Sequence, residues 1–505
     1  MAKKNMNVLF IMTDQHRADH MGCAGNPVVK TPNLDRLAQE GVRFTNAYCA
    51  NPMCMPNRAS IFTGVYPNVH GVRSNGINLP NTVETFVEAM RKNGYITHNV
   101  GKMHLQFFIP PYKRKDESAE MIAKWMHPDT AQEALDTFPQ PYYGFEDCEI
   151  CLGHGDICGG HYLNWLEEKR PGATEWMRNR LTLDYFHHVY FKSEMPVEQY
   201  PTTYCQERTI NFLERHSKGE YGDKPFFLCC SIPDPHHPVC PPGEYHDMYK
   251  TDDIELPPTF VDKNIEDHKF LGPLVKNPVF RGAMLRQSDE QEVKEFTRLT
   301  YGAVTLFDQA IGQILSSLEK SGYAENTIVI YTSDHGDLMG DHGMIYKGPS
   351  PFEGVLKVPL IMKVPGVTTS GSVSNSLVSS IDFAKTILNL TKVRKRLHSP
   401  FIQGVDITPV LNDPEIKVRD CCYIEEDEEV GPLKIRVRHL ITETHKLTVY
   451  EGLEGVGDIY DRINDPDELN NLWDKDRDLR ENLVLKILEE NLKAQTKLPA
   501  RQAAS

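Results

Sequence analysis

A cysteine and an arginine four residues apart form the first pattern in this sequence that could do chemistry. Cys54 is followed by Pro56 and Arg58, and the segment continues to Gly64. A thiol placed in this way could act as a nucleophile. The same residues could instead be a buried cysteine ahead of a helix that begins with proline, a favoured helix start. The pattern alone is therefore only a candidate site.

Two acidic residues, each followed by a polar residue, come at the ends of apolar runs. Asp14 and Gln15 follow the first run, and Asp334 and His335 follow a later one. The carboxyl ends of parallel strands meet at one crevice, so these side chains should converge. A single aspartate of this kind is commonly a loop cap. Two carboxylates with an imidazole and further oxygen donors are explained better by a site for a hard divalent cation than by two separate loop caps.

Several other polar residues have an ordinary explanation when each is taken singly. A lysine usually lies on a solvated face, and a histidine beside a proline usually lies in a loop. The residues in question are Asn75, Lys102, His104, His236 and Lys347.

Together, these residues resemble the active site of the sulfatases, which are formylglycine-dependent enzymes of the alkaline-phosphatase superfamily. The resemblance covers most of the first 365 residues, and a later family segment has its counterpart at 404–411. It implies that a formylglycine-generating enzyme oxidises Cys54 to formylglycine. It also implies hydrolysis of a sulfate ester, with release of inorganic sulfate and an alcohol.

The resemblance also implies a role for each residue. The metal is expected to be Ca²⁺, with Mn²⁺ or Mg²⁺ as alternatives. Its ligands would be Asp14, Gln15, Asp334, His335 and the modified Cys54. The catalytic residues would be Cys54, Arg58, Lys102, His104, His236 and Lys347, and the substrate would contact Asn75, Lys102, His236 and Lys347. His236 is preferred to His237 because only His236 fits the family pattern His-x-Pro. One hydroxyl of the hydrated formylglycine would attack sulfur, and the other would lose its proton to His104 as sulfate leaves.

Departures from the common sulfatase pattern keep a second function open. Asn57 stands where serine or alanine is usual, and the combination of Gln15 with His335 is shared with choline-sulfatase-like enzymes and phosphonate monoester hydrolases. A phosphonate monoester or phosphodiester hydrolase is therefore the alternative. Lys102 with His104 favours the sulfatase, because the phosphonate hydrolases tend to have tyrosine and threonine there. A non-enzymatic relative would lack at least one key residue, and none is missing.

The elements that must position these residues follow from the alternation of short apolar runs with helical patterns. This order predicts an α/β fold with a large, mostly parallel or mixed sheet sandwiched by helices, as in alkaline phosphatase. Strands are predicted at 7–13, 95–100, 225–232, 327–332 and 358–363, and helices at 32–40, 82–93, 200–216 and 290–321. Weakly periodic insertions at about 105–195 and 240–285 should lie over the carboxyl edge of the sheet.

The pattern changes after about residue 405, where antiparallel strands are expected at 419–425, 434–442 and 445–450. A helix at about 476–496 should follow them. We therefore predict a catalytic domain at 1–415 and a small α+β domain at 416–505.

Composition limits the partners. The net charge of −15 over 505 residues argues against nucleic acid or an anionic membrane as partner. An acidic protein that binds an anion also needs a locally positive pocket. No stretch approaches the roughly 18 apolar residues of a membrane span, and the first apolar run is too short for a signal peptide. A cytoplasmic protein is expected, and a homo-oligomer stays possible.

The twelve cysteines are expected to be reduced thiols. A zinc site is suggested by one group of cysteines and histidines that lie close together in the sequence. The group consists of Cys148, Cys151, His154, Cys158 and His161. No second ligand pair closes it, so a glycine-rich loop that carries thiols is preferred. The same histidines could also reach a sugar hydroxyl. A sulfated carbohydrate is the expected substrate, with a small organic sulfate such as choline sulfate as the alternative.

Overall fold

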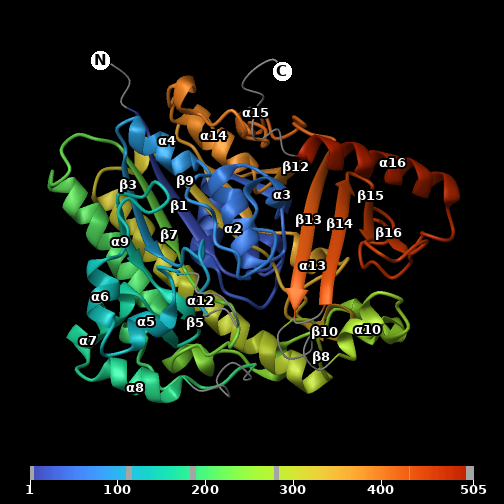
Figure 1. Cartoon of the computed structure of the whole chain (residues 1–505), viewed down its shortest axis with the longest axis horizontal. Helices are drawn as coiled ribbons and strands as arrows, with labels where there is room; N and C mark the ends of the chain where they lie inside the picture. Colours follow the sequence, from blue (N-terminus) through green and yellow to red (C-terminus); the bar gives the residue numbers. More distant parts are fainter. Residues whose placement is uncertain (1–4, 110–116, 182–188, 278–283, 431–432, 496–505) are drawn as a thin grey trace.

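The computed structural model describes residues 5–109, 117–181, 189–277, 284–430 and 433–495. An eight-stranded sheet with the order β12-β2-β11-β9-β1-β7-β3-β4 runs through the larger part of the molecule (Figure 1). Its strands are β1 (Asn7–Thr13), β2 (Val42–Tyr48), β3 (Ile96–Gly101), β4 (Asp147–Ile150), β7 (Phe226–Ser231), β9 (Thr327–Ser333), β11 (Leu360–Lys363) and β12 (Ser372–Ser379). The predicted α/β fold is confirmed.

The sheet is mixed because one strand runs against its neighbours. β1 pairs in parallel with β7 and β9, whereas β11 is antiparallel to both β9 and β2. The chain leaves β9 and returns as β11 from the same edge of the sheet, and a strand that returns in this way must be antiparallel. The long connection between them at 334–359 therefore stays at the carboxyl edge, where the site lies.

Helices cover both faces of the sheet (Figure 1). One layer contains α2 (Cys54–Thr63), α4 (Phe86–Lys92) and α14 (Asp382–Leu390). The other contains α1 (Pro32–Glu40), α9 (Pro201–Ser217) and α12 (Glu290–Lys320). The predicted helix at 82–93 starts only at Phe86, because Thr85 accepts a hydrogen bond from the Glu88 amide and so caps it.

The predicted insertions have more secondary structure than their weak periodicity suggested. They contain α5 (Ile122–Met126), α6 (Ala131–Asp136), α7 (His161–Lys169), α8 (Ala173–Arg180), the hairpin of β5 (Leu152–His154) and β6 (Ile157–Gly159), and α10 (Leu271–Val275). Short helices of this kind carry little periodic signal, and their apolar residues pack on the main domain.

A second, four-stranded antiparallel sheet follows, with α16 (Arg477–Ala494) on one of its faces (Figure 1). Its strands are β13 (Cys421–Val430), β14 (Leu433–Thr442), β15 (His445–Tyr450) and β16 (Gly457–Asp461). Two of these results correct the prediction. The short β16 was missed, and β13 continues through an acidic run that has no apolar alternation. The domain boundary near residue 415 stays a prediction.

In the described ranges, no helix has both the length and the apolar content that a membrane crossing would need.

An arginine joins the second sheet to the first. Arg462 follows β16, and its guanidinium donates to Glu353 Oε1 at 2.8 Å and to Asn46 Oδ1 at 2.8 Å. Tyr48 donates to the same Glu353 oxygen at 2.7 Å. These partners hold a largely buried carboxylate, so the pair stabilises the contact between the two sheets.

We predict that Arg462→Ala lowers the free energy of unfolding by about 2 kcal/mol, because it removes the charged donor that joins Glu353 to the second sheet and leaves this carboxylate with Lys357 and Tyr48. Arg436→Ala is the control, since Arg436 pairs with Glu451 at the surface, and it should cost less than about 0.5 kcal/mol. Urea unfolding measures both. Equal losses in the two variants would contradict this account.

Candidate active site

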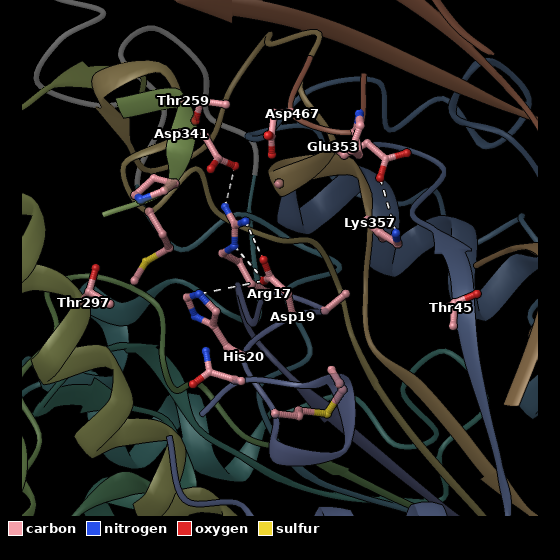
Figure 2. A pocket seen from close by; sticks show the side chains of 18 of the residues that line it. Arg17, Asp19, His20, Thr45, Thr259, Thr297, Asp341, Glu353, Lys357 and Asp467 are labelled. Atoms are coloured by element: carbon pink, nitrogen blue, oxygen red, sulfur yellow. Dashed lines mark hydrogen bonds and ion pairs between the residues drawn. The ribbon is translucent and has the colours of Figure 1, made fainter. Parts of the chain in front are cut away.

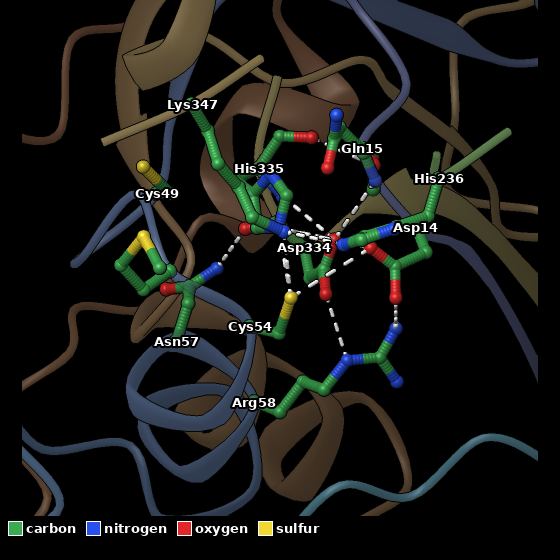
Figure 3. A network of polar contacts seen from close by, with 12 residues as sticks. Asp14, Gln15, Cys49, Cys54, Asn57, Arg58, His236, Asp334, His335 and Lys347 are labelled. Atoms are coloured by element: carbon green, nitrogen blue, oxygen red, sulfur yellow. Dashed lines mark hydrogen bonds and ion pairs between the residues drawn. The ribbon is translucent and has the colours of Figure 1, made fainter. Parts of the chain in front are cut away.

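Four buried side chains converge where two strands of the main sheet end (Figure 3). Asp14 follows β1, Asp334 and His335 follow β9, and Cys54 is the first residue of α2. One ligand atom from each lies within 4.8 Å of the others. The parallel pairing of β1 with β9 brings the two aspartates to the same level.

The geometry of His335 fits a metal ligand. Its Nδ1 lies 2.9 Å from the Gly336 carbonyl oxygen, which can only accept, so Nδ1 carries the proton. Nε2 therefore presents a lone pair to the cluster, 3.1 Å from Cys54 Sγ and 3.7 Å from Asp14 Oδ1. A backbone acceptor that fixes the tautomer in this way is typical of metal-binding histidines.

Gln15 also fits this role. Its Nε2 donates to Asp337 Oδ2 and lies 3.1 Å from His237 Nδ1. Its Oε1 is buried and has no hydrogen-bond partner among the described residues. An oriented amide oxygen that lacks a donor is suited to a cation. Four of the predicted ligands therefore lie together with metal-ligand spacing, and the role of Gln15 as the fifth stays a prediction.

Arg58 links the two aspartates. Its Nε donates to Asp334 Oδ2 at 2.7 Å, and an Nη donates to Asp14 Oδ2 at 3.3 Å. The other Nη donates to the Lys102 carbonyl and to Ser231 Oγ, each at 2.9 Å. Because all these groups are fully buried, the guanidinium sets the relative positions of the strand ends.

Lys102 and His154 form the next contact. Lys102 Nζ pairs with Asp14 Oδ2 and lies 2.7 Å from His154 Nε2. His154 comes from the β5–β6 hairpin, and its ring stacks on His236 with 3.6 Å between centroids. The sequence allows His154 to be either a substrate contact or a loop residue, and the structure places it beside Lys102 and His236.

Lys347 contacts the nucleophile position directly. Its Nζ lies 2.9 Å from Cys54 Sγ, 2.8 Å from His236 Nε2 and 3.0 Å from His335 Nε2. Burial and Asp14 raise the pKa of the Cys54 thiol, but nearby cationic side chains outweigh them and lower it. The structure thus brings the predicted Lys347 and His236 together.

His104 lies at the side of the cluster. Its ring stacks on Phe108 at 3.8 Å and is 6.5 Å from the His154 ring. Its Nδ1 is buried and has no partner among the described residues. Burial and the charge of Lys102 lower the pKa of His104 well below its usual value, so the imidazole is neutral and able to accept a proton.

The two asparagines have different surroundings. Asn75 Oδ1 accepts from the Met55 amide at 3.1 Å, which holds its loop beside α2. Asn57 donates to the Asp334 carbonyl and accepts from the Ala50 amide at 2.9 Å. Asn57 departs from the common sulfatase pattern, and here it helps to hold Asp334.

The three cysteines at 148–158 lie in or beside short strands of the described chain. Cys148 lies in β4 and Cys158 in β6, so the segment is strand and hairpin rather than the glycine-rich loop that we expected. The thiols of Cys148, Cys151 and Cys158 are all buried, and none of them forms a disulfide bond. Within the described residues, the only group with metal-ligand spacing is the one around Asp14.

A cavity of about 570 Å³ is lined in part by Met339 and Asp341, which belong to the segment that follows β9 (Figure 2). Arg17 points into it and pairs with Asp19 and Asp341 at 2.7 and 2.6 Å. Arg17 also donates to the carbonyls of Asp337 and Leu338. The wall of this cavity therefore supports the loop that orients Gln15, but Cys54 does not line it.

Comparisons with known proteins show the family to which the chain belongs. A family model described as Sulfatase matches residues 6–393, and one described as N-sulphoglucosamine sulphohydrolase, C-terminal, matches 340–497. An arylsulfatase of Clostridium perfringens is 29% identical over 92% of this chain and 90% of its own length. An N-acetylglucosamine-6-O-sulfatase of Bacteroides thetaiotaomicron is 26% identical over 97% of this chain and 87% of its own length. The crystal structure of a phosphonate monoester hydrolase of Agrobacterium radiobacter has the same fold, with a TM-score of 0.78, 23% identity, and coverage of 98% of this chain and 97% of that one.

We predict that Asp337→Asn weakens the binding of a divalent cation, with Ca²⁺ as the probe, by about 10- to 100-fold, because the new amide can no longer accept from Gln15 Nε2. Oδ1, which caps the Met339 amide, is kept in this variant. Calorimetric titration with Ca²⁺ measures the effect. Asp129→Asn, which changes an exposed carboxylate outside the site, is the control. Unchanged affinity in Asp337→Asn would show that Gln15 is not a ligand.

Proposed function

This chain belongs to the sulfatase family and is a sulfuric ester hydrolase, and we propose that its nucleophile is a formylglycine formed from Cys54. Formylglycine would supply a hydrated carbonyl with two hydroxyls, so that one can attack sulfur while the other allows sulfate to leave. We further propose that a formylglycine-generating enzyme matures the chain. The alternative is a phosphonate monoester or phosphodiester hydrolase on the same scaffold.

One observation carries this proposal. Cys54 Sγ, which marks the position of the nucleophile, contacts both the Lys347 ammonium and the proposed metal ligands. A thiol buried for structural reasons needs neither Lys347 at 2.9 Å nor His335 at 3.1 Å. A nucleophile that attacks an anionic ester needs both kinds of contact, because charge develops on the ester oxygens.

A divalent cation, which we propose to be Ca²⁺, would act as a Lewis acid that acidifies the attacking hydroxyl and offsets charge on the sulfate. The chain's own residues then have distinct tasks. Arg58 keeps Asp14 and Asp334 in register, and Lys102 holds Asp14 from the other side. These buried ion pairs preorganise the site, so little rearrangement is needed when substrate binds.

The leaving oxygen would meet Lys347 and His236. The Lys347 ammonium donates to His236 Nε2, so a proton is already shared between them at 2.8 Å. We propose that these two residues neutralise or protonate the leaving oxygen, and that Asn75 and Lys102 bind the transferred group. His104, whose imidazole is neutral, would accept the proton of the second hydroxyl.

We propose that the substrate is a sulfated carbohydrate or a small organic sulfate. The N-acetylglucosamine-6-O-sulfatase that matches 97% of this chain supports the first choice. The chain carries a net charge of −15, but Arg58, Lys102 and Lys347 provide the local positive charge that an anionic ester requires.

The reaction class is tested by comparing kcat/KM for one aryl leaving group attached to sulfate and to phenylphosphonate. We expect sulfate to be preferred by at least about a thousandfold, because Lys102 and His104 take the places of the tyrosine and threonine of the phosphonate enzymes. Peptide mass must first confirm that Cys54 is converted. A preference for the phosphonate would overturn the main proposal in favour of the alternative.

Cys54→Ala should lower kcat by at least about 10⁴-fold on the aryl sulfate, because the nucleophile is removed. Circular dichroism and the melting temperature should stay close to those of the wild type. Cys421→Ala, which removes a buried thiol of the second sheet, should keep full activity. Retained turnover in Cys54→Ala would exclude the formylglycine mechanism.

A further inference from the structure

A histidine outside the predicted catalytic set contacts one of the two buried lysines of the site. Lys102 Nζ lies 2.7 Å from His154 Nε2, and it also pairs with Asp14 Oδ2. An ammonium group has three N–H donors and no acceptor, so it donates to both atoms. Nε2 of His154 is therefore unprotonated. Burial and the charge of Lys102 lower the pKa of His154 well below its usual value, so the ring is a neutral acceptor.

Two acceptors fix the orientation of this ammonium group. In the part of the chain that the structure describes, Lys102 Nζ has Asp14 and His154 as hydrogen-bond acceptors and no third. The three N–H bonds point to the corners of a tetrahedron, so two bonds held by the protein also set the direction of the last one. Lys102 is fully buried, so this direction is not averaged by free rotation in solvent.

The contact with Asp14 leaves room for the proposed metal. Lys102 and Arg58 both donate to Oδ2 of Asp14. The other oxygen, Oδ1, lies 3.8 Å from Cys54 Sγ and 3.7 Å from His335 Nε2. One carboxylate oxygen thus serves the cations of the protein, and the other faces the metal-ligand cluster. The two bonds of Lys102 are therefore compatible with a bound cation.

The second lysine of the site has the same kind of partner. Lys347 Nζ lies 2.8 Å from His236 Nε2. The rings of His236 and His154 stack, with 3.6 Å between their centroids and 13° between their planes. Each lysine therefore has its own imidazole acceptor, and the two imidazoles support each other. His154 holds at Lys102 the position that His236 holds at Lys347.

The backbone around His154 is shaped to present this one side chain. His154 ends β5 and pairs with Ile157, across a two-residue turn that starts at Gly155 with a φ of +59°. Gly153, on the other side, has a φ of +114°, and a Cβ there would lie 2.7 Å from the Ile157 carbonyl oxygen. Glycine is thus required on both sides of the histidine.

The turn is also anchored from outside the hairpin. Asp156, its second residue, is buried, and its Oδ2 accepts from Ser193 Oγ at 2.6 Å and from Arg180 at 3.1 Å. Two other segments of the insertion therefore hold the hairpin that carries His154. Such support is what a functional side chain needs if it must be placed accurately.

We propose that His154 is a positioning residue of the sulfatase reaction, which holds the Lys102 ammonium so that its third N–H meets a nonbridging oxygen of the transferred sulfate. This inference rests on the proposed function, in which Lys102 binds the transferred group. It adds to the site a residue of the β5–β6 hairpin, outside the main sheet. Because His154 acts through Lys102, its effect is independent of the alcohol that leaves.

The test compares two variants of His154 on 4-nitrophenyl sulfate and phenyl sulfate. His154→Phe keeps a ring that can stack on His236 but removes the acceptor. It should lower kcat/KM about 10- to 100-fold on both esters, as expected for one hydrogen bond to a charged donor. His154→Gln keeps an acceptor within reach of Lys102 and should stay within about threefold of the wild type. His127→Phe, at an exposed histidine of the same insertion, is the control and should keep full activity.

Circular dichroism checks the fold of each variant, and His154→Ala replaces the phenylalanine variant if that chain does not fold. Unchanged kcat/KM in His154→Phe, or an equal loss in His154→Phe and His154→Gln, would overturn the proposal. A loss that differs more than about tenfold between the two esters would also contradict it, since His154 would then act at the leaving oxygen.

If the wild type turns over neither ester after confirmed conversion of Cys54, the sulfatase function itself fails. Calorimetric titration with inorganic sulfate then still tests the role of His154. We expect about tenfold weaker sulfate binding in His154→Phe and nearly unchanged binding in His154→Gln. Equal affinities in the wild type and both variants, or no binding to the wild type, would count against the proposal.

Discussion

The buried guanidinium of Arg58 is the interaction on which the rest of the site depends. It contacts the carboxylates that end β1 and β9, the backbone after β3, and the serine that ends β7. Four strands thus reach one side chain that is itself anchored in α2. A buried arginine needs most of its donors satisfied, so a shift of any of these strands would leave an unpaired charge. This constraint keeps the strand ends level and so keeps the metal-binding atoms together.

The charges around this centre explain how a protein with a net charge of −15 can act on an anionic ester. Lys102 and Lys347 are buried against the cluster, where Lys102 contacts Asp14 and Lys347 contacts Cys54. Each is held by an acidic group or a histidine, and the rings of His154, His236 and His237 form a stack between them. Positive charge is concentrated at a few fixed atoms, where a developing oxyanion would be stabilised most.

The second sheet contributes to this site as well as to stability. Arg462 ties it to the main sheet through Glu353, and β13 brings its acidic run to the loop that carries Asn75. The two edges of the second sheet thus make different contacts with the main domain, and the β13 edge reaches the loop that carries Asn75.

The sequence by itself determined the reaction centre and the main fold. The spacing of Cys54 and Arg58, and the position of Asp14 and Asp334 after apolar runs, are local patterns, and strand ends in a parallel sheet converge for topological reasons. The buried strands were equally readable, because a strand covered on both faces is a continuous apolar run.

Tertiary structure alone decided the surroundings of this centre. Three side chains act across contacts between residues far apart in the chain. Asp337 orients Gln15, His154 contacts Lys102, and Glu428 accepts a hydrogen bond from Ser74, the residue before Asn75. Residues 425–429 of β13 are all acidic and so lack the apolar alternation that marks a strand. Their partners include Ser74, Arg73 and Arg438, which come from other segments. Local periodicity reports which face of an element is apolar, and it holds no information on which distant polar group will meet a buried charge.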